Sequence, residues 1–158
     1  MFFHEHGIAT VMLGDAVTGE ARDVAKVYAA LAKEIRREPK HWRPPVALLS
    51  GGETTVTVKG NGRGGRNTEF LLSLTIELNG LDNIYAIACD TDGIDGLEDN
   101  AGAILTPNTW SQAEKLGINA RRLLAQNDSY HFFEQLNDLV ITGPTYTNVN
   151  DYRAILIF

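Results

Sequence analysis

Residues 50–69 constrain the fold more than any other stretch, because they hold six of the fifteen glycines of this 158-residue chain. Apolar runs flank the segment at 46–49 and at 70–72. Glycine is favoured where the backbone turns with positive φ or approaches another group closely. We therefore expect a buried strand, a glycine loop with exposed amide groups and a helix, which together resemble the framework of an anion site.

Apolar runs and amphipathic patterns alternate along the rest of the chain. A repeat of three or four residues indicates a helix, and a short apolar run bounded by turn residues indicates a buried strand. The predicted helices are 21–35, 67–78, 110–115, 119–124 and 128–136. The predicted strands are 7–15, 46–49, 83–89, 139–142 and 152–158, while 101–105 fits either a short strand or a helical turn.

Two further pairings complete the predicted sheet. Residues 55–59 carry β-branched side chains with a period of two, so we expect a hairpin there. The runs 139–142 and 152–158 flank a polar loop, and we expect them to pair with each other. This mixture of crossovers and hairpins predicts an α/β fold with a mixed β-sheet flanked by helices, a three-layer sandwich.

The composition excludes several classes of protein. The net charge of −6 opposes nonspecific binding to nucleic acid or to anionic lipid. No apolar run approaches the roughly 20 residues of a membrane span, and the single cysteine, Cys89, provides no disulfide framework. We therefore expect a cytoplasmic protein of common domain size, without a nucleic-acid or membrane partner.

The glycine loop matches two phosphate-binding patterns at once. Gly60-x-Gly62-x-x-Gly65 fits the dinucleotide fingerprint, and the same stretch continued by Arg66 has P-loop spacing with Arg in place of Lys. Neither pattern is specific when both match, and an exposed loop with glycine turns is the alternative. Both patterns share a helix N-terminus that favours anions, to which Arg66 adds a permanently charged, bidentate group.

Acidic residues are concentrated just after the predicted strand 83–89. Five carboxylates fall within residues 90–99, and Ile94 occupies a position that an EF-hand would need for a ligand. They can form Asx turns that cap the local backbone, or they can hold Mg²⁺. Because ligands collect where strands of α/β sheets end, we favour Asp90 and Asp92 as metal ligands.

A second polar loop precedes the last predicted strand. Its hydroxyl, amide and carboxylate groups could bind a polyol or a carboxylate, or could satisfy the turns of the loop itself. These residues are Thr145, Thr147, Asn148, Asn150 and Asp151.

Five ordered motifs together resemble the MOFRL domain, the C-terminal part of bacterial and archaeal glycerate 2-kinases, many of which are labelled hydroxypyruvate reductase. The motifs are LSGGETTV at 49–56, GGRN at 64–67, DTDGIDG at 90–96, NDSY at 127–130, and TGPT at 142–145 with TNVND at 147–151. The resemblance covers residues 46–158. Residues 1–45 resemble the end of a preceding Rossmann-like domain, or a connecting strand and helix. The chain departs from the family pattern at Thr68 and Tyr146, where Gln and Gly are expected.

The resemblance implies phosphoryl transfer from ATP to the 2-hydroxyl of D-glycerate, with Mg²⁺, in a cleft between two domains of one polypeptide. It implies that Arg66 stabilises charge on the substrate or on the transferring phosphoryl group. It also implies that Asp90, Asp92 and Asp95 hold the metal or order the cleft. The residues implied to contact substrate or phosphate are Ser50, Gly51, Gly52, Glu53, Gly64, Gly65, Asn67, Thr145, Asn148, Asn150 and Asp151.

The family's N-terminal domain, with its essential lysine, lies outside this chain. We therefore expect the isolated chain to fold but not to turn over glycerate, and a homo-oligomer is compatible with the resemblance. Two alternatives remain. One is an NAD(P)H-dependent hydroxypyruvate or tartronate reductase that uses the glycine loop for its cofactor. The other is a noncatalytic module whose acidic loops bind a partner.

Overall fold

The protein is built on one six-stranded mixed sheet. The structure, a computed structural model, describes residues 2–158. Its strands are β1 (Ala9–Val17), β2 (Val46–Gly52), β3 (Ile84–Asp90), β4 (Gly102–Leu105), β5 (Leu139–Val140) and β6 (Asp151–Ile157). Their order across the sheet is β1-β2-β6-β3-β4-β5. Only β1 and β2 pair in parallel, so the C-terminal strand β6 lies antiparallel between β2 and β3.

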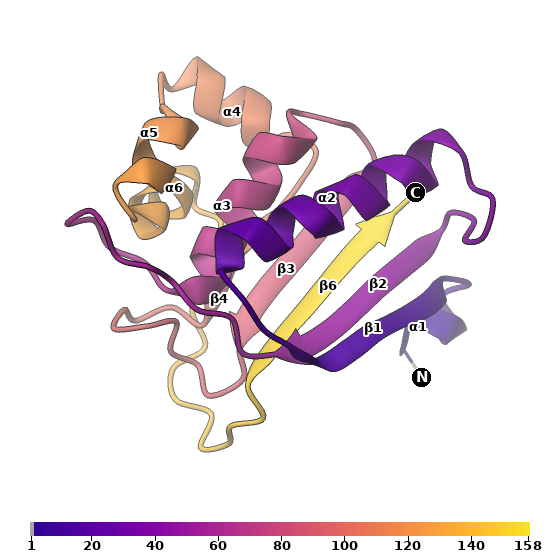
Figure 1. The fold of residues 1–158 in the computed structure, drawn as a ribbon, viewed down its shortest axis with the longest axis horizontal. Coiled ribbons are helices and arrows are strands. Elements are labelled where there is room, and N and C mark those ends of the chain that lie inside the picture. Colours follow the sequence, from indigo (N-terminus) through magenta and orange to yellow (C-terminus); the bar gives the residue numbers. More distant parts are fainter. Residues whose placement is uncertain (1) are drawn as a thin grey trace.

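Helices cover one face of this sheet (Figure 1). They are α2 (Ala21–Arg37), α3 (Arg66–Leu78), α4 (Thr109–Lys115), α5 (Ala120–Ala125) and α6 (Ser129–Leu136), while the short α1 (Phe2–Glu5) lies at the β1 edge. The apolar side chains of α2, α3 and α6 join those of the strands in one core. The predicted α/β class with a mixed sheet is confirmed.

Helix α3 occupies the centre of the helical layer. Phe70, Leu71, Leu72 and Leu74 have no exposed surface. Because α3 is buried on nearly every side, apolar residues occur on nearly every face of the helix. The helix packs between α2 on one side and α5 and α6 on the other. Because α3 is held on all sides, its first residue, Arg66, is presented from a rigid element.

The other face of the sheet stays partly open in the described residues. Tyr85 on β3 and Tyr152 on β6 alternate with buried residues and keep 43% and 41% of their surface exposed. The described helices α2 to α6 thus form one layer on the sheet. Of the three predicted layers, residues 2–158 show two, the sheet and this helical layer, and place no helical layer on the face with these tyrosines.

Two predicted strand pairings are wrong. Residues 55–59 form no hairpin, because their hydroxyl and amide groups bind the Glu20 carboxylate instead: Thr57 N and Thr57 Oγ1 donate to it at 3.0 and 2.9 Å. The runs 139–142 and 152–158 also do not pair. The short β5 pairs with β4, and two strands, β3 and β4, separate it from β6, which lies between β2 and β3. Residues 101–105, left open above, contain strand β4.

The N-terminal strand and helix belong to the same packing unit as the rest. β1 pairs with β2 over residues 9–17, and α2 packs along α3. Alanines at 21, 25, 29 and 32 allow this close approach, because each is fully or almost fully buried. The predicted domain boundary at residue 45 stays a prediction. No described helix is long and apolar enough to cross a membrane.

Candidate functional site

The site lies where three strands and one helix meet at one end of the sheet. β2 ends at Gly52 and β3 ends at Asp90, and both are register partners of Asp151, the first residue of β6. Asp90 and Asp151 are thus opposite each other on neighbouring strands, a pairing that like charges make unfavourable. Helix α3 begins above this point with Arg66, whose positive charge offsets the repulsion.

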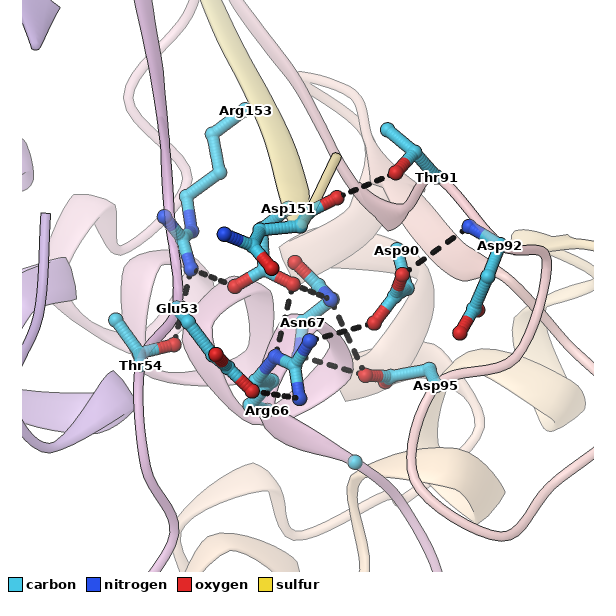
Figure 2. A network of polar contacts seen from close by, with 12 residues as sticks. Glu53, Thr54, Arg66, Asn67, Asp90, Thr91, Asp92, Asp95, Asp151 and Arg153 are labelled. Atoms are coloured by element: carbon cyan, nitrogen blue, oxygen red, sulfur yellow. Dashed lines mark hydrogen bonds and ion pairs between the residues drawn. The ribbon is translucent and has the colours of Figure 1, made fainter. Parts of the chain in front are cut away.

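Arg66 contacts three carboxylates (Figure 2). Its Nε donates to Asp151 Oδ1 at 2.8 Å, its Nη2 donates to Asp90 Oδ2 at 2.6 Å, and its Nη1 lies 3.5 Å from Glu53 Oε1. The Asp151 and Asp90 side chains are almost fully buried, whereas the Glu53 side chain is 62% exposed. The guanidinium is therefore held by buried carboxylates at Nε and Nη2, and its Nη1 side contacts the exposed Glu53.

Burial and neighbouring charges shift the pKa values of Arg66 and Asp90 in opposite directions. Burial alone would lower the pKa of the Arg66 guanidinium, but the carboxylates of Asp151, Asp90 and Glu53 raise it above its usual range. Burial raises the pKa of Asp90, and Arg66 opposes that rise. Arg66 therefore carries its charge at every physiological pH.

A second arginine supports the first from the core. Arg153, which sequence analysis did not single out, is 1% exposed; its Nη2 donates to Asp151 Oδ2 and, at 2.9 Å, to Thr54 Oγ1. Asn67 Nδ2 donates to Asp151 Oδ1 at 2.8 Å. The signal for Arg153 was present in the sequence as the one charged residue within the predicted apolar strand 152–158.

Asp95 caps helix α3 and is not placed as a metal ligand. Its Oδ1 accepts from Asn67 N at 2.9 Å, and its Oδ2 accepts from Thr68 N at 2.9 Å and from Thr68 Oγ1 at 2.8 Å. The side chain is fully buried; burial raises its pKa, and these hydrogen bonds oppose the rise. The anion that the helix N-terminus favours is thus supplied by the protein itself.

The three predicted metal ligands do not converge. Asp95 is committed to α3, Asp90 is ion-paired with Arg66, and Asp92 accepts from Ile94 N at 2.8 Å in an Asx turn. Among residues 2–158, no three His, Cys, Asp or Glu side chains are arranged to hold a metal ion. These residues do not by themselves fit a resident Mg²⁺ site.

The amide groups of Gly60 and Gly62 donate to neighbouring residues of the protein, contrary to the expectation that the glycine loop exposes its amides. Gly62 N donates to Gln126 O at 3.0 Å, and Gly60 N donates to Asn127 Oδ1, also at 3.0 Å. A Cβ on Gly60 would lie 2.6 Å from Gln126 Cα, and one on Gly62 would lie 2.6 Å from Asp128 Cα. These glycines are therefore needed because the loop packs directly against the backbone between α5 and α6.

The remaining predicted glycines also serve close packing. A Cβ on Gly52 would lie 2.9 Å from the carbonyl carbon of Val17 on β1, and one on Gly64 would lie 2.9 Å from Tyr130 N. Gly65 is the N-cap residue of α3 and packs against Asp95. Gly51 is packed between β1 and β6, close to Asp15 and Asp151.

The two loops beside Arg66 are joined by hydrogen bonds. Thr145 N donates to Asp92 O at 3.0 Å, Val149 N donates to Thr91 Oγ1 at 2.9 Å, and Asn148 Nδ2 donates to Asp92 Oδ2 at 3.3 Å. Several predicted substrate-binding groups thus satisfy the turns of their own loops, which was the alternative left open above. Tyr146 points outward with 98% of its surface exposed.

The predicted residues consequently separate into two groups. Glu53, Arg66, Asn67, Asp90 and Asp151 come together in one connected network. Ser50 is buried beneath it on β2 with its Oγ unpaired, and Thr145, Asn148 and Asn150 lie on the adjoining loop.

Comparison with known proteins identifies the family. The model of the MOFRL family matches residues 46–151, about two thirds of the chain. The chain belongs to the MOFRL family.

Relatives of this MOFRL chain carry two kinds of name. A protein of Agrobacterium vitis named "Putative hydroxypyruvate reductase" is 53% identical over 154 residues, and the D-glycerate 2-kinase of Thermotoga maritima is 40% identical over 153 residues. The match covers 96% and 97% of this chain but only 40% and 37% of those proteins. The crystal structure of a glycerate kinase from Thermotoga maritima superposes with a TM-score of 0.95 at 38% identity, covering 99% of this chain and 38% of that one.

Proposed function

We propose that this chain is the C-terminal part of a glycerate 2-kinase, which transfers a phosphoryl group from ATP to the 2-hydroxyl of D-glycerate in a cleft between two domains. Two facts support the proposal. A relative named for this activity is 40% identical over nearly the whole chain, and the part of that relative not covered here has room for a second domain. In this arrangement one wall of the cleft is the end of the sheet at which Arg66, the first residue of α3, contacts Asp90 and Asp151.

The observation that carries the proposal is the orientation of Arg66. Its Nε and Nη2 are held by buried carboxylates, and its Nη1 faces the exposed Glu53 at 3.5 Å. Glu53 makes the longest of the three contacts and is the partner most easily displaced, because its side chain is mostly solvated. An arriving phosphate or carboxylate would replace Glu53 and take a charge-assisted hydrogen bond from a guanidinium that is already positioned.

Phosphoryl transfer needs charge stabilisation and alignment more than covalent help from the protein. Arg66 provides the charge stabilisation. Asp90 and Asp151 provide the alignment, because they hold the Arg66 guanidinium in place. Because the carboxylates here do not converge on a metal position, we derive no step through Mg²⁺. The phosphates of ATP do not use the α3 N-terminus in this proposal, because Asp95 already occupies it.

The test is an assay of ADP formation with D-glycerate and ATP in the complete enzyme. Arg66→Ala should lower kcat/KM by about 100-fold or more, the loss typical of removing one electrostatic contact to a transition state. Arg63→Ala is the matched control, because Arg63 is in the same loop but pairs with Glu98 at 3.0 Å and covers the ring of Tyr130. Full activity of Arg66→Ala would contradict the role of Arg66 in charge stabilisation and favour a noncatalytic role for this domain, whereas no ADP formation by the wild-type enzyme would contradict the proposed function itself.

The isolated 158-residue chain provides a second test. It should be folded by circular dichroism and inactive in the same assay, because the opposite wall of the cleft belongs to the uncovered part of the relatives. Normal turnover by the isolated chain would contradict the two-domain proposal.

A reductase remains the second candidate, because the Agrobacterium vitis relative carries that name. The glycine loop argues against it. A dinucleotide fingerprint uses its glycines to let the cofactor approach, but here Gly60 and Gly62 are packed against residues 126–128. NADH oxidation with hydroxypyruvate, measured beside ADP formation with D-glycerate, separates the two candidates.

A further inference from the structure

We propose that Arg153 is a positioning residue for Arg66, acting through Asp151. The geometric part of the inference stands on the contacts within this chain, and its consequence for turnover rests on the proposed function. Arg153 does not reach the Nη1 side of Arg66, so it is not itself a catalytic residue. It orients the carboxylate that orients Arg66 (Figure 2).

The contacts form a chain from the core to the site. Asp151 and Arg153 are two residues apart on β6, so their side chains share the face of the sheet that α3 covers. Arg153 Nη2 donates to Asp151 Oδ2, and the other oxygen, Oδ1, accepts from Arg66 Nε at 2.8 Å. Thr54 Oγ1 accepts from the same Arg153 nitrogen at 2.9 Å. Thr54 therefore holds the Arg153 guanidinium in place, and the guanidinium in turn holds Asp151.

The sequence makes room for this buried arginine. Its register partners are Ser50 on β2 and Ala88 on β3, both small, and Phe70 of α3 lies over its guanidinium with the ring centroid 5.3 Å from Cζ. A large side chain in place of Ser50 or Ala88 would occupy the space that the guanidinium fills.

Arg153 is poorly satisfied as a purely structural group. It is 1% exposed, and its Nε and Nη1 have no hydrogen-bond partner among the described residues. Burying a charge with unpaired donors costs stability, and an apolar side chain of similar size would pack there at a lower cost. The ion pair with Asp151 is the interaction that offsets this cost.

The alternative is that Arg153 only neutralises the buried charge of Asp151. That role would require a cation near Asp151 but no defined geometry at Arg66. The two roles differ in one observable, the order of the Arg66 side chain, which depends on Asp151 being held at both oxygens.

The first experiment observes Arg66 directly, without an activity assay. In the ¹⁵N-labelled chain, the Arg66 Nε–H resonance should exchange slowly with water, because this group donates to a buried carboxylate. Arg153→Lys should speed the exchange at least ~10-fold, since lysine replaces a rigid planar fork by a compact ammonium group on a flexible stem. Arg36→Lys, on the surface pair with Asp82, should leave the resonance unchanged.

A second variant guards against misfolding of Arg153→Lys. Thr54→Val keeps the charge and the approximate volume but removes the oxygen that fixes Arg153. It should accelerate Arg66 Nε–H exchange in the same direction and by a smaller factor. Unchanged exchange in folded Arg153→Lys, or in Thr54→Val if the lysine variant unfolds, would overturn the inference.

The second experiment is a double-mutant cycle on kcat/KM in the complete enzyme. If Arg153 acts through Arg66, Arg153→Lys lowers kcat/KM at least ~10-fold, and Arg66→Lys/Arg153→Lys is no worse than Arg66→Lys alone. If the double variant instead lost kcat/KM by the product of the two single-variant factors, the inference would be overturned. No ADP formation with D-glycerate by the complete wild-type enzyme, together with accelerated Arg66 Nε–H exchange in Arg153→Lys, would refute the proposed function and leave the positioning role intact.

Discussion

Replacing Asp95 by asparagine should destabilise the protein substantially, because this carboxylate is the cap of helix α3. Asparagine has one acceptor oxygen and one NH₂ group, and the NH₂ group must face either Asn67 N or Thr68 N, both of which are donors 2.9 Å from the carboxylate. One buried backbone N–H is then unpaired, at a cost of about 1–3 kcal/mol. Loss of the negative charge at the helix N-terminus adds up to about 2 kcal/mol.

Because burial raises the pKa of Asp95, relief of the charge burial offsets much of this loss. The net loss should be about 2 kcal/mol, or a fall of roughly 4–8 °C in Tm for a chain of this size. Urea and thermal unfolding followed by circular dichroism measure it. Asp92→Asn is the matched control in the same loop: Asp92 is more exposed and accepts only one backbone bond, from Ile94 N, so its loss should stay below about 1 kcal/mol. Equal losses for the two variants, or a wild-type Tm that EDTA lowers, would refute the capping role.

Two further predictions concern the glycine loop and the single thiol. Gly62→Ala should lower the free energy of unfolding by about 1–3 kcal/mol in urea, because its Cβ would lie 2.6 Å from Asp128 Cα; an unchanged midpoint would show that the loop does not pack as described. Burial, with the nearby carboxylates, raises the pKa of Cys89 from 9.0 to about 12, so its alkylation by iodoacetamide at pH 8 should be about 1000-fold slower in the native than in the unfolded chain. The folded state keeps this proton while the unfolded state releases it, so Cys89 should also make stability fall as pH rises from about 9 to about 12; native alkylation at the unfolded rate would contradict both expectations.

Most elements of the fold could be predicted from the sequence because their signals are local. Apolar residues spaced three or four apart predicted α2, and apolar runs predicted β1, β2, β3, β5 and β6, whereas β4 was left open between a strand and a helical turn. Strand pairing was harder, because it depends on distant partners. Residues 55–59 have strand-like composition, but Glu20, far away in the sequence, takes their hydrogen bonds.

The glycine loop shows why a motif alone misled. Its spacing fits ligand-binding loops, and the sequence could not show that residues 126–128 would occupy the same space. Asn127 is the decisive residue: its Oδ1 accepts from Lys59 N at 2.8 Å and its Nδ2 donates to Glu69 Oε2 at 3.0 Å, which ties the loop to α3. Local patterns predicted that glycine was required, but not what approached it.

The acidic residues 90–99 have different roles, which the sequence could not distinguish. Asp90 and Asp95 are five residues apart, yet one pairs with Arg66 and the other caps the helix that carries Arg66. Arg153 was missed because a single arginine in a strand has no motif. Its role depends on Asp151 being at the first position of the same strand, opposite Asp90.

In the proposed function, Arg66 faces the reacting groups of a kinase cleft. A crystal structure of the complete enzyme with a nonhydrolysable ATP analogue and D-glycerate would show this arrangement. We expect Arg66 Nη1 within about 3 Å of a phosphate or glycerate oxygen, with Glu53 displaced and Asp90 and Asp151 still bound to Arg66. Both ligands bound away from Arg66, with the Glu53 contact intact, would contradict it.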